Sequence, residues 1–152
     1  MRVTTELCKG VLNSETCTDV YNWLRDNIPW EEAVRSKAGH TRLAYSVHSA
    51  DIVMHTIEPL IVSALCVCDI QKPCDGIYIN YYRNGEDWTP NHSHKGTTQV
   101  IISLGADRTL TVGKKNYTLS NGDVCVFGSS VHGVPKDSST QGRISIALFI
   151  SN

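Results

Sequence analysis

The sequence predicts a mainly β protein of the α+β class: a jelly-roll barrel backed by two or so N-terminal helices. Three observations lead to this prediction. From residue 76 onward, short segments alternate apolar and polar residues with the period of two that β-strands have. Turn signals rich in glycine and asparagine separate these segments, and many short strands joined in this way are typical of a barrel or a double-sheet jelly roll. The first part of the chain instead shows apolar spacing typical of helices.

Two helices are expected in the first half of the chain. Residues 14–28 carry an apolar stripe that includes Leu24 and Ile28, which predicts a helix with one buried face. Pro59 suits the first turn of a second helix, and the almost wholly apolar residues 60–67 follow it. A helix with so few polar residues is expected to be buried, here as a support behind a sheet.

The first clear strand is predicted at residues 76–82. Its alternation places Tyr78, Asn80 and Tyr82 on one face, because successive side chains of a strand point to opposite sides. Glycine or asparagine marks the turns between the strands that come next. Those strands are expected at residues 99–104, 108–112, 116–119 and 124–127, with turns at 113–115 and 121–123.

Residues 143–150 form the last predicted strand. Arg143, Ser145, Ala147 and Phe149 share one of its faces, and branched apolar residues fill the other. An arginine that points into a barrel is costly to bury unless a partner compensates its charge. The alternation alone leaves open whether Arg143 points into the barrel or lies on the surface of an edge strand.

The composition fits one globular domain spanning residues 1–152, with helical support over about 1–75 and the barrel core over about 76–152. A formal net charge of −1 gives no electrostatic reason to bind long nucleic acid. Residues 1–9 lack the apolar stretch of a secretory signal, and no run is long enough to span a membrane. The six cysteines form no C-x-x-C pair. We therefore expect a monomeric cytoplasmic protein with free thiols.

Three histidines form the candidate metal site. His92 and His94 are two residues apart, so in an extended segment both point to the same side. His132 follows a later predicted strand and can supply a third ligand. Three protein ligands with open positions are typical of a catalytic rather than a structural metal site.

The surroundings of these histidines resemble the AlkB-like branch of the Fe(II)/2-oxoglutarate-dependent oxygenases. The resemblance covers roughly residues 42–149 and depends on an ordered set of motifs, with a weaker echo of the family's substrate lid at residues 41–45. The motifs are N-x-Y-x-x-G at Asn80, Tyr82 and Gly85, H-x-H at His92 and His94, I-S-L-G at residues 102–105 followed by Arg108, a Gly-Asp turn at residues 122–123, the distal His132 before Val-Pro, and the final strand from Arg143 to Phe149.

The resemblance implies a double-stranded β-helix, another name for the jelly-roll barrel, and a dioxygenase that hydroxylates or demethylates its substrate. Iron would be held by His92, His94 and His132. The cosubstrate 2-oxoglutarate would be held by Arg143, whose planar fork suits a carboxylate, together with Asn80, Tyr82 and Ser145. O₂ would be the second cosubstrate.

His94 is the main departure from the family, because it stands where the family has a metal-binding aspartate. Three interpretations follow: a 2-oxoglutarate enzyme with altered geometry or outcome, a three-histidine oxygenase independent of 2-oxoglutarate (as thiol dioxygenases are), or a non-catalytic metal- or ligand-binding barrel. The presence of Arg143, Asn80 and Tyr82 favours continued use of 2-oxoglutarate.

The residues that the resemblance places near the substrate also depart from the family. Phe149 replaces the second arginine of the family's last motif, and little chain precedes residue 42 to form a nucleotide-recognition lid. With the near-neutral charge, these features argue against repair of alkylated bases. Nucleobases, nucleotides, amino acids and protein side chains all remain candidate substrate classes.

Overall fold

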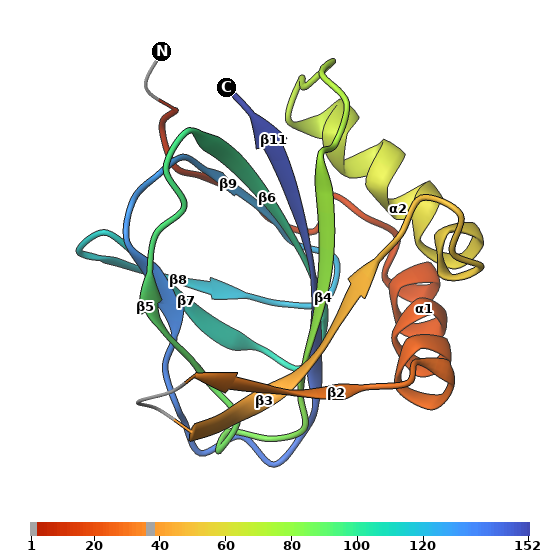
Figure 1. Ribbon diagram of the computed structural model, residues 1–152, viewed down its shortest axis with the longest axis vertical. Helices are drawn as coiled ribbons and strands as arrows, with labels where there is room; N and C mark the ends of the chain where they lie inside the picture. The colour runs from red at the N-terminus through yellow and green to blue at the C-terminus, as the bar shows by residue number, and fades with distance from the viewer. Residues whose placement is uncertain (1–2, 36–38) are drawn as a thin grey trace.

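The computed structural model describes residues 3–35 and 39–152, which form two antiparallel β-sheets and two helices. The sheets lie face to face, and both helices cover the outer face of the larger sheet (Figure 1). This arrangement is the jelly roll that the sequence predicts. The fold class is therefore confirmed.

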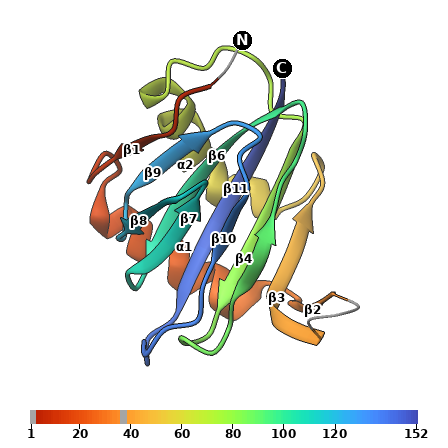
Figure 2. The same cartoon turned by 90° about the vertical axis from the view of Figure 1, so that its left-hand side faces the viewer.

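The larger sheet has seven strands and the smaller sheet has four in the described part of the chain. Figure 2 views the molecule from the side of the smaller sheet. In spatial order the larger sheet consists of β1 (Glu6–Cys8), β9 (Val124–Phe127), β6 (Thr97–Gly105), β11 (Arg143–Ser151), β4 (Gly76–Tyr82), β3 (Gly39–Val47) and β2 (Glu31–Arg35). The smaller sheet consists of β5 (Thr89–His92), β10 (His132–Val134), β7 (Arg108–Val112) and β8 (Lys115–Leu119).

Helix α1 (Ser14–Asn27) lies close to its predicted position. The side chain of Asn13 accepts a hydrogen bond from the backbone N–H of Thr16 at 2.9 Å, which caps the first turn. Val20 and Leu24 are buried against the larger sheet, as the helical stripe predicts. Neither described helix is long and apolar enough to cross a bilayer.

Helix α2 (Val53–Val67) begins six residues before Pro59, so the predicted start of this helix is wrong. At the true start, the carboxylate of Asp51, one residue before the N-cap Ile52, accepts a hydrogen bond from the backbone N–H of Val53 at 3.0 Å. Pro59 lies inside the helix and removes one backbone hydrogen bond there. Burial of Ile57 and Leu60 against the sheet offsets this loss.

The first 75 residues contribute three strands as well as the two helices. Strands β2 and β3 pair with each other, and β3 continues the larger sheet by pairing with β4. Strand β1 forms the opposite edge beside β9. None of these strands was expected. Strands β1 and β2 are the two edges of the sheet, and edge strands are stabilised by backbone pairing and need no continuous apolar run. The predicted helical support is therefore partly a sheet extension.

Alternation along β11 divides the apolar side chains into two layers. Ile144, Ile146 and Leu148 pack with the helices, whereas the odd-numbered side chains face the space between the sheets. Ala147 belongs to that second layer, which also includes Phe127. The predicted inward face of this strand is therefore confirmed.

Candidate metal centre and anion site

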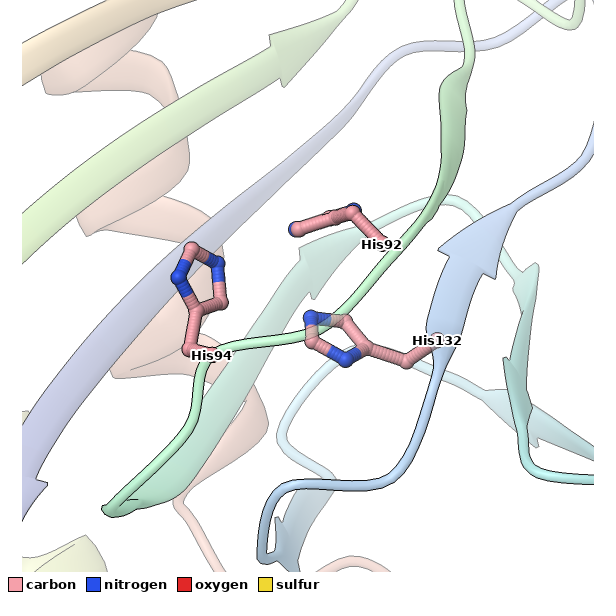
Figure 3. Close-up of side chains that lie close together, drawn as sticks. All are labelled: His92, His94 and His132. Atoms are coloured by element: carbon pink, nitrogen blue, oxygen red, sulfur yellow. The ribbon is translucent and has the colours of Figure 1, made fainter.

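The side chains of His92, His94 and His132 lie close together (Figure 3). One ligand atom from each ring lies within 4.8 Å of the others. The ring centroids are 4.3 Å apart for His92 and His132, 4.9 Å for His92 and His94, and 5.7 Å for His94 and His132. The structure thus brings together all three predicted ligands.

Strand pairing places two of these rings side by side. His92 on β5 lies directly opposite His132 on β10 in the antiparallel register. Gly133 permits this close pairing, because a Cβ there would lie 2.5 Å from Oδ1 of Asn91. His94 lies beyond the end of β5, in the turn before β6, where its carbonyl oxygen accepts a hydrogen bond from Thr97 Oγ1 at 3.0 Å.

Backbone carbonyl groups orient two of the imidazoles. Nδ1 of His92 lies 2.8 Å from the carbonyl oxygen of Pro90, and Nδ1 of His132 lies 3.0 Å from that of Ser130. A carbonyl oxygen only accepts, so each Nδ1 carries a proton, and in the neutral ring Nε2 is the nitrogen free to bind a metal. Such a carbonyl partner is a common support for a metal-binding histidine.

Burial also favours the neutral form of His132. Its side chain is mostly removed from solvent, and this desolvation lowers its pKa to about 4, with a smaller contribution from the neighbouring His92 and His94. An imidazole that is neutral near pH 7 can coordinate a metal without first losing a proton.

The histidines line a cavity of about 470 Å³ between the two sheets. Strand register brings the candidate cosubstrate residues to the same cavity, since Arg143 pairs with Tyr82 and Ser145 pairs with Asn80 across β11 and β4. All seven residues singled out from the sequence line this one cavity: His92, His94, His132, Asn80, Tyr82, Arg143 and Ser145.

Arg143 is a buried cation with few protein partners. Its side chain is 1% exposed, and its Nε donates a hydrogen bond to Oγ of Ser103 at 3.0 Å. Its guanidinium carbon lies 5.4 Å from the ring centroid of Tyr82. One terminal nitrogen, Nη2, has no hydrogen-bond partner, and no carboxylate within residues 3–35 and 39–152 forms an ion pair with it. Burial lowers its pKa to about 10, so it stays charged near pH 7.

Three further polar residues line the cavity and were not singled out from the sequence: Arg42, Thr89 and Gln99. Arg42 on β3 is 8% exposed, and its Nε donates to Oδ1 of Asn80 at 2.9 Å. Gln99 on β6 is 2% exposed, and its amide nitrogen has no hydrogen-bond partner. Alternation within β6 contained the signal for Gln99, whereas Arg42 depends on a strand that was not expected.

The side chains fit a divalent metal together with an anion. Three neutral imidazoles suit a transition metal, and open positions would remain for further ligands. The guanidinium of Arg143 suits a carboxylate, because its planar fork can donate two parallel hydrogen bonds. Among the described residues that line the cavity there is no aspartate or glutamate, so a bound anion would meet no like charge from them.

No family profile matches the chain, and no curated protein matches it in sequence. The fold, however, is similar to that of many solved structures. One is the non-heme alpha-ketoglutarate-dependent epimerase SnoN from nogalamycin biosynthesis, with a TM-score of 0.71 and 15% identity over 97% of this chain and 77% of that one.

Two other solved structures extend the comparison. A prolyl hydroxylase from Trichoplax adhaerens, in complex with a hypoxia-inducible-factor peptide, has a TM-score of 0.70 and 11% identity over 97% of this chain and 83% of that one. A predicted oxalate decarboxylase from Thermotoga maritima has a TM-score of 0.58 and 14% identity over 84% of this chain and 96% of that one. At such identities the likeness establishes the jelly-roll fold that these proteins share.

Proposed function

We propose that this protein is an AlkB-like Fe(II)- and 2-oxoglutarate-dependent dioxygenase that hydroxylates or demethylates its substrate at a three-histidine metal site. The observation that carries the proposal is Arg143, a buried cation without a carboxylate partner among the described residues, which lines the same cavity as the three histidines. A buried charge of this kind is costly unless a ligand compensates it. A dicarboxylic acid that also reaches the metal would do so.

Seven residues of the cavity have a role in this proposal. His92, His94 and His132 hold Fe(II), and Arg143 holds the distal carboxylate of 2-oxoglutarate. When bound, iron and 2-oxoglutarate together supply the activation of O₂ and the electrons for it. On the wall nearest Arg143, the protein offers further hydrogen-bonding groups to the cosubstrate, from Tyr82, Asn80 and Ser145.

Both the motif resemblance and the similarity of fold support this proposal. The motifs run in order through the barrel strands, and the structural neighbours include an alpha-ketoglutarate-dependent epimerase and a prolyl hydroxylase by name. We further propose that residues 1–152 act as a single domain, as a monomer and in the cytoplasm. The prime substrate is an amino-acid or protein side chain, or a nucleobase or nucleotide.

The direct test is the visible charge-transfer band of 2-oxoglutarate chelated to iron. The protein is loaded anaerobically with Fe(II), and 2-oxoglutarate is then titrated in. We expect the band to appear in the wild type and to be lost in His92→Ala and His132→Ala. His55→Ala is the matched control, because His55 is an exposed residue on helix α2 and lies outside the cavity.

Two results would contradict the proposal. One is a wild-type protein that binds Fe(II) and gives no band with 2-oxoglutarate. The other is a band that persists in both His92→Ala and His132→Ala, because the metal would then lie elsewhere.

A second candidate is a three-histidine oxygenase that does not use 2-oxoglutarate. The donor set favours it, because His94 supplies a third neutral nitrogen where a carboxylate would otherwise bind the metal. This candidate predicts O₂ uptake with a thiol or diketone in the absence of 2-oxoglutarate, unaffected by Arg143→Met. Metal binding without turnover on any such compound would instead favour a non-catalytic binding barrel.

A further inference from the structure

Two residues that line the cavity each carry a buried donor atom without a hydrogen-bond partner: Nη2 of Arg143 and Nε2 of Gln99. The proposed function accounts for Arg143 and leaves Gln99 unexplained. A buried amide without a partner costs about 1–3 kcal/mol. A group that destabilises the ligand-free protein in this way is expected to gain its partner when a ligand binds.

The position of Gln99 places it at the histidine end of the cavity. On the neighbouring strands it pairs with Phe127 of β9 and Phe149 of β11. The ring of Phe127 lies 4.7 Å from that of His132, and the ring of Phe149 lies 5.1 Å from that of His94. Gln99 therefore lies between two aromatic residues that each contact one histidine of the cluster.

Arg143 lies at the other end of the same sheet face. It pairs with Gly105, six residues further along β6 than Gln99, which corresponds to roughly 20 Å of strand. The side chains of Arg143 and Gln99 both project into the cavity between these ends. The side chain of Arg143 reaches toward Gln99, because its Nε donates to Oγ of Ser103, four residues from Gln99 on β6 or roughly 13 Å of strand. An extended five-carbon dicarboxylate with a hydrogen bond at each end is close to this length.

We infer that Gln99 is a ligand-positioning residue, whose side-chain amide donates a hydrogen bond to the end of 2-oxoglutarate that lies at the histidines. The inference rests on the proposed function. Arg143 fixes one carboxylate, and Gln99 orients the oxygen atoms at the opposite end. A neutral amide does this without placing a negative charge beside the bound acid.

The test compares Gln99→Met with Gln71→Met. Methionine keeps the length of glutamine and removes its polar atoms, and Gln71 is an exposed residue in the loop between α2 and β4. Two quantities are measured: the dissociation constant of 2-oxoglutarate on the anaerobic Fe(II) protein, from the visible band, and the thermal midpoint of the metal-free protein.

For Gln99→Met we expect 2-oxoglutarate to bind roughly tenfold more weakly or worse, because a hydrogen bond to a charged group is lost. The thermal midpoint of this variant without ligand should be equal to or higher than that of the wild type, because an unpaired buried amide is removed. Gln71→Met should change neither quantity. Gln99→Glu, which replaces the donor by a carboxylate of the same shape, should bind more weakly than Gln99→Met.

An unchanged dissociation constant in both Gln99 variants overturns the inference and leaves the proposed function intact. A lower thermal midpoint of Gln99→Met with unchanged binding also overturns it, because Gln99 would then be a structural residue. Absence of the band in the wild type overturns the proposed function and this inference together.

Discussion

Two buried arginines flank one tyrosine ring, and their surroundings differ. The guanidinium carbons of Arg108 and Arg143 lie 5.1 Å and 5.4 Å from the ring centroid of Tyr82. Each arginine is 1% exposed. By burial and by aromatic contact alone, the two residues are equivalent.

Their hydrogen-bond partners separate them. The terminal nitrogens of Arg108 donate to the carbonyl oxygens of Asn84, Asp87 and Pro135 at 3.1, 2.8 and 2.8 Å. Its Nε also lies 3.2 Å from a carboxylate oxygen of Asp137 in an ion pair, without the alignment of a hydrogen bond. Arg108 thereby connects two loops.

Arg143, by contrast, has Ser103 as its hydrogen-bond partner and leaves one nitrogen without any. The comparison teaches that a buried arginine marks a binding site only when the protein fails to satisfy it. Arg108 is structural by this criterion, although it belongs to the motif resemblance, and Arg143 is the candidate for ligand binding.

The largest effect is expected from Arg108→Met. This change leaves three carbonyl oxygens without their donor and Asp137 without its counter-charge, so we expect a loss of about 4 kcal/mol in the free energy of unfolding. Urea unfolding of the metal-free protein measures it. A loss below about 1 kcal/mol would show that these contacts do not stabilise the loops.

Arg143→Met, unlike Arg108→Met, should weaken ligand binding without destabilising the fold. We expect 2-oxoglutarate to bind about 100-fold more weakly, because a buried charged hydrogen bond to a carboxylate is lost. The free energy of unfolding should stay the same or rise, because methionine removes a desolvated charge. Parallel measurements of the dissociation constant and of urea unfolding check both parts. Strong destabilisation with normal binding would reverse the assigned roles.

His132 extends the comparison to a buried base that, unlike the two arginines, is neutral near pH 7. Its pKa falls from 6.5 to about 4 in the folded protein, chiefly through burial. The unfolded chain therefore takes up the proton first as the pH falls, and stability decreases between pH 6.5 and about 4. We expect the metal-free protein to lose about 2 kcal/mol by pH 5.

Urea unfolding at pH 7.5 and pH 5, with a chelator present, tests this expectation. His132→Gln serves as the comparison, because its amide does not titrate and the other ionisable groups remain. The difference in unfolding free energy between the two pH values should be smaller in this variant. An equal difference in both proteins would assign the pH dependence to other groups.

The smallest effect is expected from Tyr82→Phe. The ring between the two arginines remains, and the hydrogen bond of 2.6 Å between the hydroxyl oxygens of Tyr82 and Thr89 is lost. We expect a decrease of about 1 kcal/mol in the free energy of unfolding. Tyr82→Leu should destabilise further, because it also removes the ring from both guanidinium groups. Equal stability of the two variants would show that contact between the ring and the two guanidinium groups does not stabilise the fold.

The sequence predicted the parts of the site that depend on local periodicity. The inward face of the last strand placed Arg143 and Ser145 correctly, and the H-x-H spacing placed two histidines on one side. It did not predict strands β2 and β3, which depend on backbone pairing with each other and with β4. Nor did it predict the start of α2, where the backbone N–H of Val53 donates to the carboxylate of Asp51. It assigned a role to Arg143 and none to Arg108, but it did not predict the partners of Arg108, because these come from distant parts of the chain.

The most direct test of the account compares two ligands on two proteins. The anaerobic Fe(II) forms of the wild type and Arg143→Met are titrated with 2-oxoglutarate and with 2-oxopentanoate, which carries a methyl group in place of the distal carboxylate. We predict that the wild type binds 2-oxoglutarate about 100-fold more tightly than 2-oxopentanoate, and that the variant binds both equally weakly. Equal affinities in the wild type, or a preference for 2-oxoglutarate that persists in the variant, would contradict the assignment of Arg143 as the carboxylate receptor.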